Sequence, residues 1–170
     1  MSEIMKEICE QLSAQRLPRW DELPDLELYM DQVLSLVERY LSSYPGADGK
    51  ALTASMVNNY VKKGVMPPPV KKKYTRVHLA HLLMICVLKV VLPIDQIRHL
   101  LHESRKDRDE QAVYDDFCET FESSAAEAAE AARNESGVAG IYRSALRAQA
   151  ERALAIKWYN AVREADQKNA

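Results

Sequence analysis

One apolar run constrains the fold more than any other feature of the chain. From Val77 to Val91 nearly every residue is apolar, and Pro93 follows shortly after. A helix that is apolar nearly all round belongs in a protein core. Two histidines and Lys89 interrupt the run, so we expect a buried helix, capped by Thr75, rather than a membrane span of about 20 apolar residues.

A second helix is expected just before this run. Thr53 can cap it, Val57 and Tyr60 mark its apolar side at helical spacing, and Gly64 can end it. Its opposite side carries small polar and basic residues: Ser55, Asn58, Asn59, Lys62 and Lys63. Amides and lysines are groups that read base edges and contact phosphates, so we expect the helix from Ser55 to Lys63 to read a DNA major groove.

The charges around these helices are sorted by sign. Between Gly49 and Ile94 there are eight basic residues and no Asp or Glu, although the whole chain has a net charge of -2. Such a basic surface suits a polyanion, and it is also compatible with a plain solvated face. Three prolines from Pro67 stiffen an extended segment that leads to a basic tip. The predicted DNA contacts are Ser55, Asn58, Asn59, Lys62, Lys63, Lys71, Lys72, Lys73, Tyr74 and Arg76.

The order of helix, basic tip, buried helix and short helix resembles the winged helix-turn-helix of the MerR family of bacterial regulators. Val57 to Pro67 looks like the recognition helix and the start of the wing, and Tyr74-Thr75 looks like its end. Leu92 to Ile97 looks like the following turn and helix. The chain differs where Asn58 and Asn59 stand in place of the usual arginine and tyrosine. The resemblance implies a winged helix-turn-helix fold.

A closer resemblance extends from Leu17 to about Leu101. This stretch is similar to a bacterial family catalogued as domain of unknown function eighteen thirty-six. The matching segments are Tyr29 to Gln32, Met56, Asn58 to Tyr60, and Lys72 to Tyr74. This resemblance implies the same fold and no particular activity.

The flanking segments also read as helices. Met1 to Leu17 has an amphipathic pattern, Asp25 can cap a helix from about Leu26 to Ser43, and Tyr44 to Gly49 has a loop composition. From Glu103 the chain becomes charged and then alanine-rich. Two helices with a break at Asn134 to Gly137 suggest a hairpin. We therefore expect a mostly α protein with a MerR-like winged helix-turn-helix and a C-terminal α-helical hairpin.

The expected division is a DNA-binding domain with N-terminal helices over residues 1–103, and a helical dimerisation or effector region over residues 104–170. Alanine faces bury little area, so the hairpin needs a partner. We expect a homodimer that uses Phe117, Phe121, Leu146, Leu154 and Trp158. A weaker alternative is a pocket for an unknown small effector, lined by Phe121, Tyr142, Trp158 and Tyr159.

The sequence offers little for catalysis. It lacks a phosphate-binding glycine loop, a nucleophile elbow and an HExxH helix, so we expect no enzyme, no catalytic residue and no cofactor. Cys9, Cys86 and Cys118 are scattered, and two His pairs spaced by three residues are weak signals for metal, so no metal site is assigned. The N-terminus lacks a secretory pattern, which favours a cytoplasmic location without membrane association.

The sequence thus predicts a dimeric, sequence-specific DNA-binding transcription regulator whose partner is double-stranded DNA. The alternative is a protein-interaction module that keeps a winged-helix scaffold and does not bind DNA.

Overall fold

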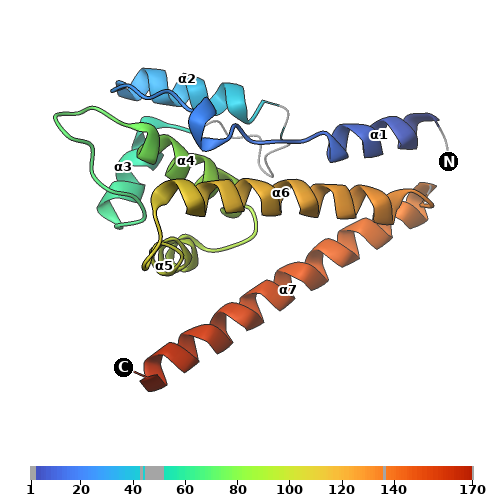
Figure 1. The fold of residues 1–170 in the computed structure, drawn as a ribbon. Coiled ribbons are helices and arrows are strands. Elements are labelled where there is room, and N and C mark those ends of the chain that lie inside the picture. The colour runs from blue at the N-terminus through green and yellow to red at the C-terminus, as the bar shows by residue number, and fades with distance from the viewer. Residues whose placement is uncertain (1–2, 43, 45–51, 136, 170) are drawn as a thin grey trace. The chain divides into compact units, whose positions relative to one another are not determined.

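The computed structural model describes residues 3–42, 44, 52–135 and 137–169 (Figure 1). In these ranges it has seven α-helices and one short 3-10 helix, which confirms the mostly α class. The elements are α1 (Glu3–Ser13), η1 (Trp20–Glu22), α2 (Met30–Tyr40), α3 (Ala54–Lys62), α4 (Arg76–Leu88), α5 (Ile94–Glu103), α6 (Glu110–Ala132) and α7 (Gly137–Asn169). Over the same residues no helix is long and apolar enough to cross a membrane.

The chain divides into two compact units. The central unit is Gln15–Ser124, and the terminal unit combines Met1–Ala14 with Ala125–Ala170. Helix α6 contributes its first part to the central unit and its last part to the terminal unit. The boundary expected near Glu103 for a DNA-binding half stays a prediction.

Helix α4 forms the centre of the core in the central unit. Ten of its residues are buried, including Leu79, Leu82 and Ile85, which have no exposed surface. Helices α2 and α5 pack on α4, and α3 packs on α2. Burying a side chain of this size contributes about 1.5–3 kcal/mol, so the ten buried residues of α4 contribute strongly to the stability of the central unit.

The expected start and end of α3 agree with the structure. The Thr53 hydroxyl accepts a hydrogen bond from the Met56 amide at 3.3 Å, as an N-cap does. After the helix, Gly64 has φ of +67°, a conformation that costs a residue with a Cβ atom about 1 kcal/mol or more. This turn sends the chain into the buried pair Val65 and Met66.

The predicted helix from Leu26 to Ser43 is too long at its N-terminal end, since α2 begins at Met30. The reason lies in a backbone pairing that the sequence pattern does not reveal. The Leu28 amide donates to the Tyr74 carbonyl at 2.8 Å, and the Tyr74 amide donates to the Leu28 carbonyl at 2.8 Å. Leu28 is therefore extended, and Gln32 accepts from the Tyr29 amide at the start of the helix.

The β-stranded wing implied by the MerR resemblance is not found as strands in the described ranges. They contain two isolated antiparallel bridges, Leu28 with Tyr74 and Val70 with Lys73. The segment between α3 and α4 projects from the helices as a loop (Figure 1). Of the expected Tyr44 to Gly49 loop, all but Tyr44 lies outside the described residues.

Candidate nucleic-acid interface

Helix α3 has one buried side and one polar side. Val57 is fully buried and Tyr60 is 5% exposed, so this side faces the core. Ser55, Asn58, Asn59, Lys62 and Lys63 are all exposed on the remaining surface. The structure therefore brings together on one short helix the polar residues that the sequence grouped by spacing.

The basic tip is a tight two-residue turn. The Lys73 amide donates to the Val70 carbonyl at 2.9 Å, and the Val70 amide donates to the Lys73 carbonyl at 3.2 Å. Between them, Lys71 and Lys72 have φ of +51° and +64°, as in the type I′ turns that normally favour Asn-Gly. Two exposed lysines thus occupy positions where a side chain is conformationally costly.

The other three residues predicted at the wing have partners within the chain. The Lys73 ammonium lies 2.7 Å from the Glu27 carboxylate and 5.9 Å from the Tyr29 ring centre. The hydrogen bond that Lys73 donates to the Glu27 carboxylate raises the pKa of Lys73. Tyr74 is only 3% exposed, because the bridge to Leu28 turns it into the core, so it has almost no surface to offer a ligand.

Arg76 is held by aromatic and acidic groups at the start of α4. Its guanidinium carbon lies 5.7 Å from the Trp20 ring centre. Its terminal nitrogens lie 3.8 Å from an Asp21 oxygen and 3.7 Å from an Asp25 oxygen. The arginine is mostly buried, whereas both aspartates are more than 80% exposed. These long ion pairs are weak enough for a stronger anion to compete with them.

His78, which follows the basic tip in the sequence, lies buried at the start of α4. It is 5% exposed, and its Nδ1 accepts a hydrogen bond from the Thr75 amide at 3.0 Å. Its ring packs edge-on against Tyr74, with 5.4 Å between ring centres. Burial lowers the pKa of His78, so the neutral ring that can accept this bond is favoured. His78 stabilises the start of α4.

The sequence reasoning missed a partly buried polar cluster that joins α4 to α6. His81 is fully buried in α4, and its Nε2 lies 2.9 Å from a carboxylate oxygen of Glu110. Arg105 contacts the other oxygen of Glu110 at 3.3 Å. The hydrogen bond from His81 is the largest cause that lowers the pKa of Glu110. The signal available beforehand was a histidine inside an apolar run, which needs a buried partner.

The residues predicted for dimerisation fall into two groups. Phe117 and Phe121 are half-buried in the central unit, where the Phe121 ring lies 5.5 Å from that of Tyr44. Leu146, Leu154 and Trp158 are 66%, 50% and 69% exposed on α7.

The alternative effector pocket finds no support on α7. Tyr142 and Trp158 are both exposed there, whereas Tyr159 is 9% exposed. Tyr142 and Trp158 are sixteen positions apart, about 24 Å along a helix, so they cannot line one small pocket.

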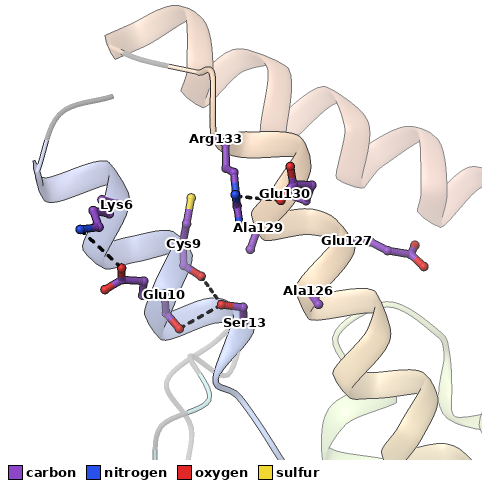
Figure 2. Close-up of a pocket in the computed structure, with 9 residues that line it drawn as sticks. All are labelled: Lys6, Cys9, Glu10, Ser13, Ala126, Glu127, Ala129, Glu130 and Arg133. Atoms are coloured by element: carbon purple, nitrogen blue, oxygen red, sulfur yellow. Dashed lines mark hydrogen bonds and ion pairs between the residues drawn. The ribbon is translucent and has the colours of Figure 1, made fainter.

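A hollow in the terminal unit lies between α1 and the end of α6 (Figure 2). Its volume is about 520 Å³, and Cys9 lies buried at its edge. Most of its charged groups have partners on the same helix: Lys6 lies 4.0 Å from Glu10, and Arg133 lies 2.7 Å from Glu130. No group of three or more possible metal ligands occurs in the described part of the chain. The described residues that line this hollow therefore form no such group of metal ligands.

Comparison with known proteins places the chain in a family through its central part. No curated protein and no solved structure matches the chain. The family described as Domain of unknown function (DUF1836) matches residues 18–121, which covers nearly all of the central unit. Because this match spans more than half of the 170 residues, the chain belongs to that family.

Proposed function

We propose that the central unit binds double-stranded DNA and recognises its sequence through α3. The observation that supports this most directly is the exposed polar side of α3, which is backed by the buried Val57 and Tyr60. The helix has nine residues, so it is about 13 Å long, and an α-helix fits the B-DNA major groove of about 12 Å width. In this proposal the protein acts as a transcription regulator.

The polar residues of α3 divide into two roles. Asn58 and Asn59 are suited to adenine, because the amide can donate to N7 and accept from the N6 amine. Lys62 and Lys63, at the C-terminal end of the helix, are suited to guanine or to a phosphate. Ser55 can contact either a base or the backbone. No acidic residue lies within α3 to repel the polyanion.

The turn at Lys71 and Lys72 is proposed to contact phosphates. Neither lysine has an ion-pair partner within the described ranges, and both are exposed. Lys73 and Arg76, by contrast, are paired with carboxylates, so each would have to exchange a partner to reach DNA. Of the six basic residues predicted to contact DNA, four therefore remain readily available to phosphates: Lys62, Lys63, Lys71 and Lys72.

The order of elements adds support, because a helix followed by a projecting basic turn and a buried helix resembles the MerR type of winged helix-turn-helix.

The carboxylates that pair with Lys73 and Arg76 favour the second candidate, a protein-interaction module. Asp21, Asp25 and Glu27 reduce the positive charge beside the turn, which would suit a partner less charged than DNA. No residue is assigned a catalytic role, and no small effector is assigned.

Selection from random duplex DNA tests the proposal. The full chain should enrich a defined sequence motif, and its affinity for that duplex should fall steeply with salt. Enrichment of no motif, together with weak binding that does not change with salt, would leave the protein-interaction module as the better account.

A further inference from the structure

The segment between α1 and α2 is anchored across the central unit. It comprises residues 17–25, which we call the strap. Leu17 and Leu23 are each only 1% exposed, so the strap is buried in the core at both of these positions. Between them, the Pro18 carbonyl accepts a hydrogen bond from the Tyr114 hydroxyl of α6 at 2.8 Å. The strap is therefore a fixed part of the central unit rather than a free linker.

Two neighbouring residues of the strap are fastened to α6. The Trp20 amide donates a hydrogen bond to an Asp115 carboxylate oxygen at 2.9 Å. The Arg19 guanidinium donates to the Glu122 carboxylate at 2.6 Å and to the Asp115 carbonyl at 3.1 Å. The side chains of Arg19 and Glu122 are each only about one-third exposed, so this charge-assisted bond is partly shielded from water. These bonds fix the position of Trp20 relative to α6.

The same strap holds Arg76, the first residue of α4. The Trp20 ring centre lies 5.7 Å from the guanidinium carbon. Asp21 and Asp25 place carboxylate oxygens 3.8 Å and 3.7 Å from its terminal nitrogens. Only 18% of the Arg76 side chain is exposed. The strap therefore connects α6 to a residue that the sequence predicts to contact DNA.

The contacts of Arg76 leave its hydrogen-bonding capacity unused. Both ion pairs are longer than a hydrogen bond, and its Nε is buried with no acceptor among the described residues. A phosphate can accept two parallel hydrogen bonds from a guanidinium. A hollow of about 410 Å³ opens beside Arg76, and its lining includes Trp20, Asp25 and Thr75. A phosphate therefore has both room and free donors there, and it is opposed by the carboxylates of the strap.

We propose that the strap is an internal competitor of DNA, which keeps Arg76 from phosphates until the strap is loosened from α6. Asp21 and Asp25 take the place of a phosphate beside the guanidinium. Trp20 is the positioning residue, because its indole face attracts the cation and limits its freedom to turn toward a ligand. The inference rests on the proposed DNA binding and adds a means of regulating it. A loosened strap should raise affinity for all duplexes alike, since phosphate contacts carry no sequence information.

The first test frees Arg76 by removing its carboxylate partners. Asp21→Asn combined with Asp25→Asn should make the slope of log affinity against log salt steeper by about 0.9, because one more phosphate is contacted. The matched control is Asp31→Asn combined with Glu38→Gln, which removes the same charge from exposed positions of α2 and should leave the slope unchanged. An unchanged slope in the first variant overturns the proposal.

A double-mutant comparison separates the release of Arg76 from a general gain in positive charge. Arg76→Gln alone should leave the salt slope unchanged, since the strap already withholds this arginine from DNA. In the Arg76→Gln background, the combination of Asp21→Asn and Asp25→Asn should no longer make the slope steeper. If the slope becomes equally steep in both backgrounds, Arg76 is not the group that the strap withholds, and the proposal is wrong.

Substitutions of Asp115 test the attachment of the strap to α6. Asp115→Ala removes the acceptor of the Trp20 amide, so it should make the salt slope steeper by the same amount as the release of Arg76. Asp115→Asn removes the same charge but keeps an oxygen that can accept this bond, so its slope should equal that of the natural chain. Equal slopes for the two variants would overturn the role of α6. Circular dichroism of every variant establishes that it is folded.

The fluorescence of Trp20 tests the hold on Arg76 without DNA. The chain has two tryptophans, so Trp158→Phe leaves Trp20 as the sole reporter. In this background Arg76→Gln and Asp115→Ala should each increase quenching by acrylamide, a neutral probe, because the indole face is uncovered, whereas Asp115→Asn should not. Unaltered quenching overturns the present inference alone, since DNA binding through α3 does not depend on it. Quenching as expected in a chain that binds no duplex overturns the proposed function, and with it the role of the strap as a competitor.

Discussion

The two lysines at the tip of the wing turn offer the most quantitative test of the proposed phosphate contacts. Lys71→Asn combined with Lys72→Gly removes both charges and creates the Asn-Gly pair that type I′ turns prefer. Because the present φ values are +51° and +64°, this variant should keep the turn and relieve backbone strain. Any loss of binding then reports charge rather than misfolding.

The expected magnitude follows from the count of available cations. If Lys62, Lys63, Lys71 and Lys72 each neutralise one phosphate, the slope of log affinity against log salt is about −3.6, and affinity falls about 150-fold between about 50 and 200 mM salt. The variant should have a slope of about −1.8 and lose only about 12-fold over the same range.

Fluorescence anisotropy with a labelled duplex measures these slopes directly. Lys6→Ala combined with Lys157→Ala is the control, since it removes the same charge from the terminal unit and should leave the slope unchanged. A wing variant whose slope equals that of the natural chain would refute the assignment of Lys71 and Lys72 to phosphates.

Three further outcomes are expected. Glu27→Gln should release Lys73 and make the salt slope steeper by about 0.9, and an unchanged slope in the same anisotropy assay would show that Lys73 does not reach DNA. Glu110→Ala should lower the free energy of unfolding by about 1–3 kcal/mol, because it leaves buried His81 without its carboxylate; an unaltered urea midpoint would contradict this. Burial lowers the pKa of His78. The contribution of His78 to the free energy of unfolding should therefore be complete above the unfolded-state pKa of about 6.5 and should decrease as the pH falls toward the folded-state pKa. The variant His78→Gln should lack this part of the pH dependence of unfolding.

Local signals predicted the parts of the fold that depend on neighbouring residues. Thr53 caps the start of α3 and Gly64 follows its end, as expected. The apolar run that includes Leu79 and Ile85 is the buried helix α4. The predicted start of α2 was wrong, because Leu28 pairs with Tyr74, which lies 46 positions further along the chain. Helix propensity contains no information about such a distant pairing.

The candidate site was predictable to a similar extent. Spacing placed Asn58 and Asn59 on the exposed side of α3, because helical periodicity fixes that relation. It could not reveal that Lys73 and Arg76 are paired with carboxylates, or that Tyr74 is buried, since those contacts come from tertiary packing. Likewise, only the folded chain shows Glu110 beside His81.

The central claim is that α3 reads DNA sequence, and the most direct measurement is a ratio of affinities. For the natural chain, Asn58→Ala and Asn59→Ala, affinity is measured on the selected duplex and on a scrambled duplex of equal length and salt. The account predicts that at least one asparagine variant loses about 1–3 kcal/mol of preference for the selected duplex while it keeps most of its affinity for the scrambled one. If both variants keep the full ratio, α3 is not the element that reads the sequence.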